Sequence, residues 1–253
     1  MTSARTARDT KPFPFMDLPP ELRDMIYDMV LTDPNGASLV SKTKACRRTV
    51  RRGRIYSSDD GTYWYGRRRL PSQGAEDNAS KTTSLVPNIL ALSKQIRDEA
   101  INYLYNQDFI FEDTVALHRF LATIGHRNQQ RLLNIEIKAF ASGRRTIPVN
   151  HCAFALLAGA TNLKSLKIGH HQGGYYRSPV NHAQGLYRTT HFFLEAYGDV
   201  HGRRDAGVDI IELPDDDFDR YYRRRLPAAH EDWSAAQNEE AFQKELRRLL
   251  GVK

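Results

Sequence analysis

The pattern of apolar positions predicts an amphipathic helix close to the N-terminus, from about Pro20 to Leu31. Its apolar residues follow the i, i+3, i+4, i+7, i+8 spacing of a single helix face: Leu22, Met25, Ile26, Met29 and Val30. Pro19 and Pro20 suit the first helical turn, where a backbone amide would have no helical partner. The turn sequence Asp33-Pro34-Asn35-Gly36 predicts where the element ends.

The pattern between residues 37 and 84 is mixed. Ser38–Val40 and Thr62–Tyr65 are rich in the β-branched and aromatic residues typical of strands, and Asp60-Gly61 fits a turn. Residues 71–84 are rich in Ser, Gly, Asn and Thr, a composition that predicts a mobile loop. We therefore expect a hairpin followed by a loop.

From residue 85 onward, helical and strand patterns alternate. The expected helices cover about residues 88–105, 113–124, 150–158, 183–197 and 234–250. The expected strands cover about residues 108–111, 133–138, 163–168 and 208–213. Alternation of this kind predicts parallel strands joined by crossover helices.

Several residues mark the ends of these helices. Asp113 fits an N-cap, Gly125 a C′ position, and Gly198 the end of the fourth helix. Ser234 and Gln237 have the spacing of a capping box at the last helix. The segment 150–158 is nearly all apolar, which predicts a helix buried on all sides.

The spacing of the strands resembles that of a leucine-rich repeat. The expected strand centres lie near residues 110, 136, 166 and 210, and the first two intervals are close to the repeat period of ~20–29 residues. Asn162-Leu163-x-x-Leu166-x-Ile168 has a similar cadence, but the last interval is longer. The predicted fold class is α/β, with an irregular leucine-rich-repeat-like stack of strands and helices whose strands are parallel.

The composition indicates in which cellular compartment the protein is expected. The longest uninterrupted apolar stretch, Cys152 to Ala158, is far shorter than the ~20 residues of a membrane-spanning helix. The polar segment 1–11 has no signal-peptide core. Two cysteines, Cys46 and Cys152, cannot form a disulfide framework, so we expect a reducing compartment, the cytoplasm or the nucleus.

Positive charge is concentrated in one segment. The chain carries a net charge of +7, but residues 41–69 alone carry +8 and the remainder −1. The aromatic residues of 63–65 lie among these cations, a pattern that favours nucleic-acid binding through phosphate contacts and base stacking. The candidate contacts are Arg47, Arg48, Arg51, Arg52, Arg67, Arg68 and Arg69. The alternative is a solvated loop without a partner, and Arg67–Arg69 also resembles a weak nuclear address.

Catalytic and metal-binding motifs are weak. His170-His171 follows an expected strand and has His182 as its one obvious neighbour, too few ligands for a metal site. The carboxylates of 215–219 resemble an EF-hand loop, but Arg220 replaces the glycine that the loop needs and Leu226 replaces its last ligand. The chain has no nucleophile elbow and no glycine-rich phosphate loop. We expect no enzyme activity, no cofactor and no metal.

Two segments carry a resemblance to a known family. Phe15-Met-Asp-Leu-Pro-Pro-Glu-Leu-Arg, followed by Ile26-Tyr27, resembles the opening of fungal F-box-like proteins. Leu90–Ala100, followed by Tyr103–Tyr105 and Phe109–Phe111, resembles their second block. The resemblance implies a protein-interaction role, in which the domain docks on Skp1 and carries a target to a cullin ubiquitin ligase.

Carried over to this chain, the resemblance assigns the Skp1 contact to the first helix: Leu18, Pro19, Glu21, Leu22 and Ile26. Two features depart from the family pattern. Ser93-Lys94 stands where the family has Cys-Arg, and about fifty residues separate the two blocks. The first helix also has a simpler interpretation, in which its apolar face closes the domain's own core.

The expected organisation has four parts. They are a disordered tail (1–12), the F-box-like first helix (13–36), a basic insertion with a hairpin and a mobile loop (37–84), and a strand–helix body (85–253).

Overall fold

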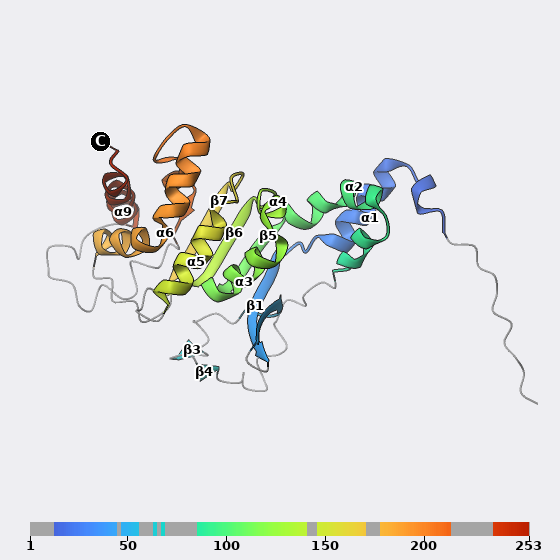
Figure 1. Ribbon diagram of the computed structural model, residues 1–253, viewed down its shortest axis with the longest axis horizontal. Coiled ribbons are helices and arrows are strands. Elements are labelled where there is room, and N and C mark those ends of the chain that lie inside the picture. Colours follow the sequence, from blue (N-terminus) through green and yellow to red (C-terminus); the bar gives the residue numbers. More distant parts are fainter. Residues whose placement is uncertain are drawn as a thin grey trace, which may run out of the picture.

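The computed structural model describes residues 13–44, 47–55, 63–64, 67–68, 85–140, 146–170, 178–213 and 235–252. Within these residues the chain is an α/β protein with a six-stranded, mostly parallel sheet, a short two-stranded sheet and eight α-helices (Figure 1). The predicted fold class is confirmed. The finer assignment to a leucine-rich-repeat-like stack stays a prediction.

The elements follow one another along the chain. The strands are β1 (Ala37–Lys44), β2 (Arg47–Arg52), β3 (Tyr63–Trp64), β4 (Arg67–Arg68), β5 (Asp108–Asp113), β6 (Asn134–Phe140), β7 (Ser165–His170) and β8 (Ile211–Glu212). The α-helices are α1 (Pro20–Leu31), α2 (Lys94–Tyr105), α3 (Thr114–Ile124), α4 (His126–Gln129), α5 (Ile147–Leu157), α6 (Pro179–His201), α7 (Ala206–Asp209) and α9 (Ala235–Leu249). Two 3₁₀ helices, η1 (Phe15–Asp17) and η3 (Pro87–Ala91), complete the set.

The large sheet has the strand order β2-β1-β5-β6-β7-β8. Strands β5 to β8 are parallel neighbours in chain order, and helices connect each to the next. This arrangement confirms the parallel strands predicted from the alternating pattern. On the other side of β5, β1 adds a parallel strand and β2 an antiparallel edge strand.

Helices cover one face of this sheet, and consecutive helices α3, α5, α6 and α9 pack against one another (Figure 1). Residues aligned across four strands are buried on this face: Phe109, Ile135, Leu166 and Ile211. Their neighbours in sequence also form a row, on the opposite face, and none of them is buried: Ile110, Glu136, Lys167 and Glu212. The second row includes an ion pair between the Lys167 ammonium and the Glu212 carboxylate at 3.3 Å. The sheet therefore has one apolar, covered face and one polar face.

A second, smaller core lies in an arm formed by η1, α1, η3 and α2, at the right of Figure 1. Its fully or nearly buried residues come from both helices: Tyr27, Leu31, Ile96 and Ala100. The Val86 amide donates a 2.8 Å hydrogen bond to the Val30 carbonyl, which ties η3 to the end of α1. The two segments that carry the family resemblance therefore pack together, although the segment between them is long.

Some helix ends were predicted correctly because local hydrogen bonding determines them. The Asp113 carboxylate accepts from the Ala116 amide at 2.8 Å and caps α3. Gly125 ends α3 with a φ of +74°, a conformation that favours glycine. The expected capping residue Ser234 lies outside the described residues, and α9 begins at Ala235 in the described part of the chain.

Other boundaries were wrong. The single helix expected over 88–105 is divided into η3 and α2, because the Ser93 hydroxyl accepts from the Ile96 amide and starts a new helix. The strand expected over 208–213 is only β8, since Val208 belongs to the short helix α7. Gly198 does not end α6, which continues to His201 and stops at Gly202 with a φ of +67°.

The helix expected to be buried on all sides has one exposed side. Ala153, Phe154 and Leu157 of α5 are buried against the core, whereas Cys152 and Ala155 are exposed. Small residues on the outer side made the segment look uniformly apolar. Helix α5 lies in the helical layer between α3 and α6, and its face away from the sheet meets solvent.

The segment expected as an insertion contributes strands to the main sheet. Ser38–Val40 lie in β1, as predicted, and the antiparallel partner of β1 is β2. Tyr63–Trp64 also form a strand, which pairs with β4 in a separate two-stranded sheet. The Asp60-Gly61 turn, the loop 71–84 and the tail 1–12 lie outside the described residues.

Candidate protein-interaction ridge

Helix α1 has two apolar faces, and only one of them is used by the protein's own core. Tyr27 and Leu31 are fully buried in the arm. Three side chains on the other face form a ridge that is exposed to solvent by 45% (Leu22), 64% (Met25) and 73% (Met29). We call these three residues the α1 ridge. Their exposure argues against the simpler interpretation that the whole apolar stripe closes the core.

The predicted docking residues lie on or beside this ridge. Leu22, Pro19 and Glu21 are exposed, whereas Leu18 and Ile26 are half-buried. The stripe predicted from the apolar spacing also includes both exposed and partly buried residues. Met25 and Met29 are exposed, whereas Val30 packs partly against the small core. The helical spacing located the apolar surface, but it did not show which part of that surface is free.

Polar contacts hold α1 in this orientation. The Arg23 Nε atom lies 3.4 Å from a carboxylate oxygen of Glu99, and the Tyr27 hydroxyl donates to Glu99 at 3.1 Å. Burial of the Tyr27 ring, together with this hydrogen bond, raises the pKa of the Tyr27 hydroxyl to about 12. The hydroxyl is therefore a neutral donor at physiological pH. Its hydrogen bond to Glu99 of α2 helps to fix the orientation of α1.

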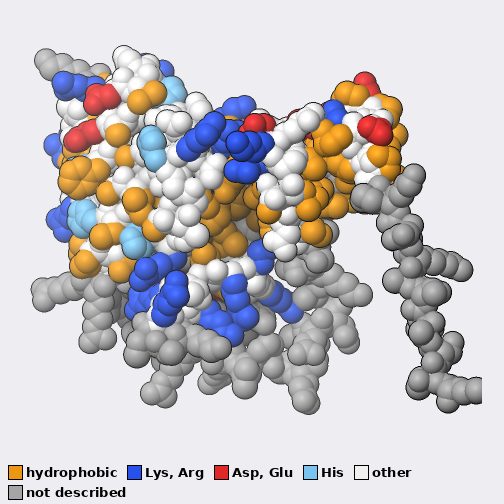
Figure 2. All heavy atoms as spheres, turned by 45° about the vertical axis from the view of Figure 1, so that its right-hand side comes forward, with side chains coloured by type: hydrophobic (Ala, Val, Ile, Leu, Met, Phe, Trp, Pro, Cys, Tyr) orange, Lys and Arg blue, Asp and Glu red, His pale blue; other side chains and the backbone are white. Residues whose placement is uncertain are grey.

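Carboxylates border the ridge. Glu21 and Asp28 are exposed on the same helix, next to the apolar residues in the helical projection. Figure 2 shows hydrophobic side chains on the arm among Asp and Glu side chains, while Lys and Arg gather mainly on the body. A partner that fits this surface would offer an apolar groove with cations at its rim.

The arm exposes further apolar residues that the sequence analysis did not single out as a surface. Leu92 is 71% exposed, Phe13 is 69% exposed and Val86 is 48% exposed. Leu92 falls within the helix expected over 88–105, but it lies just outside α2 because Ser93 is the N-cap. The serine before Lys94 was the sequence signal for this change.

The basic residues separate into two groups. Arg47, Arg48 and Arg51 are exposed on the edge strand β2. Arg52 instead pairs with the buried carboxylate of Asp33, which also accepts from the Asn35 amide at 3.1 Å.

The remaining predicted nucleic-acid contacts have less structural support. Arg67 and Arg68 form β4, and Arg69 lies outside the described residues.

The weak chemical motifs gain no support. His182 is buried, and its ring centroid lies 5.2 Å from that of Phe242, so it is part of the core between α6 and α9. In the described part of the chain, no three His, Cys, Asp or Glu side chains are grouped so as to hold a metal. His171 and the acidic segment 215–219 lie outside that part.

Comparison with known protein families gives a match over the N-terminal part of the chain. A family model described as a domain of unknown function, DUF7730, matches residues 8–150, more than half of the chain. The chain belongs to the DUF7730 family. The matched residues include α1, the antiparallel strands β1 and β2, and α2. The match ends within α5.

Neither the curated proteins nor the solved structures include a match to the chain. Within the described segments, every helix is too short or too polar to span a lipid bilayer.

Proposed function

We propose that this DUF7730 protein is a protein-interaction adaptor of the F-box type, which binds a Skp1-like protein through the α1 ridge. The observation that carries the proposal is the exposure of Leu22, Met25 and Met29 on a helix whose opposite face is anchored in the small core. An apolar face left exposed on a fixed helix suits insertion into an apolar groove of a partner.

The packing of the arm supports the proposal. The resemblance to F-box-like proteins needs the first and second blocks to be close together, and α1 contacts α2 across the long intervening segment. Full burial of one Leu or Met side chain contributes about 1.5–3 kcal/mol. Three such residues supply about 4–9 kcal/mol before the cost of association, so a micromolar contact, which needs about 8 kcal/mol net, also requires contacts from the residues around the ridge.

The polar face of the sheet is the proposed surface for a target protein. Its described side chains come from four adjacent parallel strands and are half-buried (Ile110, Glu136) or exposed (Lys167, Glu212). In this arrangement the arm would bind the adaptor and the body would bind the target. The proposed setting is the cytoplasm or the nucleus, where Skp1-type ligases work, and the proposal assigns no catalytic activity to this chain.

A binding experiment tests the role of the ridge. Purified full-length protein is mixed with purified Skp1, and capture is compared with that by a variant carrying Leu22→Ala, Met25→Ala and Met29→Ala. The proposal predicts micromolar capture by the wild type and a loss of at least tenfold in the variant. Val200→Ala is the matched control, because Val200 is 60% exposed on α6, outside the arm.

Two results would exclude this function. One is the absence of Skp1 capture by wild-type protein at micromolar concentration. The other is equal capture by the wild type and the ridge variant, with circular dichroism showing that both are folded.

Nucleic-acid binding is the second candidate function, favoured by the exposed guanidinium groups of Arg47, Arg48 and Arg51 on the edge of the sheet. Replacing these three residues with Gln should abolish salt-sensitive binding of RNA or DNA and leave Skp1 capture intact. Arg52 stays unchanged in this variant because it pairs with Asp33. If this variant behaves like the wild type in both assays, the arginines of β2 are a solvated edge whose charges keep the sheet from pairing with another strand.

A further inference from the structure

A polar groove lies at the amino-terminal edge of the parallel sheet, away from the residues of the α1 ridge. It is lined by Leu133, Lys164 and Ile210, which are the residues directly before the parallel strands β6, β7 and β8. The groove has a volume of about 790 Å³, within the usual range for a small-molecule site. The α1 ridge and this groove share no residue.

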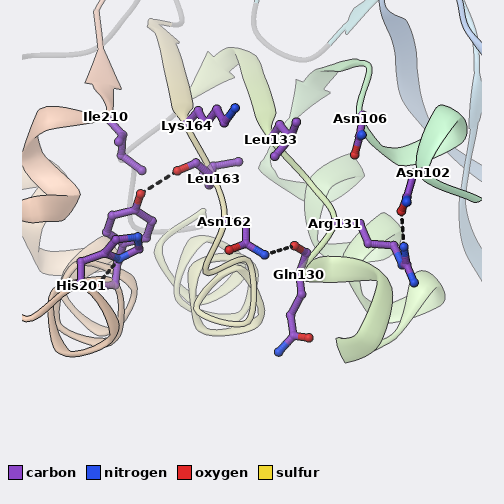
Figure 3. Close-up of a pocket in the computed structure, with 11 residues that line it drawn as sticks. Asn102, Asn106, Gln130, Arg131, Leu133, Asn162, Leu163, Lys164, His201 and Ile210 are labelled. Carbon is purple, nitrogen blue, oxygen red and sulfur yellow. Dashed lines mark hydrogen bonds between the residues drawn. The ribbon is translucent and has the colours of Figure 1, made fainter.

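Polar side chains from helices α2 and α6 and from the loops around them surround this groove. Figure 3 shows His201 of α6 on one side, Asn102 of α2 and the next residue after that helix, Asn106, on the other, and Gln130 and Asn162 between them. The walls are tied together, because the Asn162 amide donates to the Gln130 carbonyl at 2.7 Å and the Tyr197 hydroxyl donates to the Leu163 carbonyl at 2.7 Å. These bonds join the loop after α5 to the residue that follows α4 and to helix α6, so the groove is formed before any ligand arrives.

The charge of the groove is one-sided. Its described lining residues include two permanent cations, Arg131 and Lys164, together with the imidazole of His201, and no carboxylate. Two positive charges in a described lining that has no carboxylate attract an anion.

Arg131 is held in place yet has a free donor. Its Nη1 atom donates to the Asn102 side-chain oxygen, which fixes the guanidinium against α2. Its Nε atom is buried and has no hydrogen-bond partner among the described residues. A guanidinium presents its donors in a planar fork that suits two oxygens of one phosphate group.

We propose that this groove binds a phosphate-bearing small molecule, with Arg131 and Lys164 neutralising the phosphate and the amides of Asn102 and Asn106 contacting the uncharged polar remainder. Two cations match the double charge of a phosphate monoester better than the single charge of a carboxylate. The amides provide both donors and acceptors for hydroxyl or base groups. The site would bind its ligand independently of Skp1, so failure of one proposal leaves the other intact.

Binding to the full-length protein tests this site with defined probes. Inorganic phosphate, adenosine monophosphate and glucose 6-phosphate are titrated by calorimetry, beside adenosine and glucose as uncharged counterparts. We expect at least one phosphorylated probe to bind and its uncharged counterpart not to bind. Lys164→Gln and Arg131→Gln should each weaken this binding at least tenfold.

Matched variants separate the groove from general attraction by positive charge. Lys167→Gln removes the same charge from the polar face of the sheet, and Arg127→Gln removes it from the exposed side of α4; both should bind like the wild type. The variant with Arg47, Arg48 and Arg51 replaced by Gln should also bind normally. Because Arg131 contacts α2, the exposed Lys164 provides the variant that is safest for the fold.

Three results would overturn the proposal. They are no binding of any phosphorylated probe at millimolar concentration, equal weakening by the groove variants and the matched controls, and binding that Lys164→Gln leaves unchanged.

Discussion

At the scale of single residues, short-range hydrogen bonds decided which predictions were correct. Asp113 and Gly125 were identified from local preferences and fulfil their roles at the two ends of α3. Gly198 has the same local signature as a helix terminator, but it lies within α6. A glycine is needed there because the backbone of Arg203 and Arg204, just after the helix, packs against it. The local sequence around Gly198 does not reveal that contact.

Gly198→Ala should destabilise the protein although alanine favours helix. A Cβ atom placed on Gly198 would lie 2.9 Å from the backbone carbonyl oxygens of Arg203 and Arg204. Backbone atoms cannot move aside as a flexible side chain can, so we expect a net loss of about 1–3 kcal/mol in the free energy of unfolding. Urea denaturation measures this loss. An equal or greater stability of the variant would show that α6 and the following turn are not packed this closely.

Arg52→Gln should destabilise the hairpin junction. The Asp33 carboxylate is nearly inaccessible, and Arg52 is its cationic partner. Removal of that partner leaves a buried carboxylate poorly compensated, at a cost of about 1–3 kcal/mol. Arg51→Gln is the matched control, because Arg51 is exposed on the same strand. Thermal denaturation should show a lower midpoint for Arg52→Gln alone, and equal midpoints for the two variants would contradict this role.

At the scale of elements, periodicity located helices and strands but not their partners. The stripe of α1 was evident from its spacing, yet Tyr27 and Leu31, which fill the core, lay outside the predicted stripe. An element with apolar residues on two faces has two possible orientations, and tertiary contacts such as those of Glu99 decide between them. In the same way, a helix over 234–250 was predicted, and Phe242 and Leu246 of α9 are buried, but the polar link from α9 to Gln184 of α6 was not predicted.

The junction between α6 and α9 should depend on pH. Glu245 accepts hydrogen bonds from Arg248 at 2.6 and 2.7 Å and from Gln184 of α6 at 2.8 Å. The bonds from Arg248, foremost, lower the pKa of the Glu245 carboxyl from 4.5 to about 2. A lowered pKa in the folded state stabilises the protein above pH 4.5, and this contribution is lost as the pH falls from 4.5 towards 2.

Glu245→Gln tests this contribution. The variant should be less stable than the wild type near neutral pH by about 1 kcal/mol after allowance for solvent screening, and the difference should shrink as the pH is lowered through that range. Glu240→Gln on the exposed side of α9 is the control and should show no such dependence. A difference between wild type and Glu245→Gln that stays constant with pH would rule out the ionic role of Glu245. Urea denaturation across the pH range provides the measurement.

At the scale of the whole molecule, the parallel direction of β5 to β8 was predicted from the alternation of strands and helices along the chain. The division into an arm and a body did not follow, since β1 joins the sheet of the body while α1 and α2 build a separate core. The polar groove was also not predicted. Its lining comes from the ends of distant elements, such as Asn102 and Lys164, which only the folded chain brings together.

The proposed function depends most on the outward orientation of the α1 ridge, and methionine oxidation measures this orientation directly. Met25 and Met29 are 64% and 73% exposed, whereas Met16 packs partly against the small core. We predict that hydrogen peroxide converts Met25 and Met29 to sulfoxides faster than Met16, and that bound Skp1 protects Met25 and Met29. Oxidation of all three residues at one slow rate, or no protection when Skp1 is present, would contradict the account.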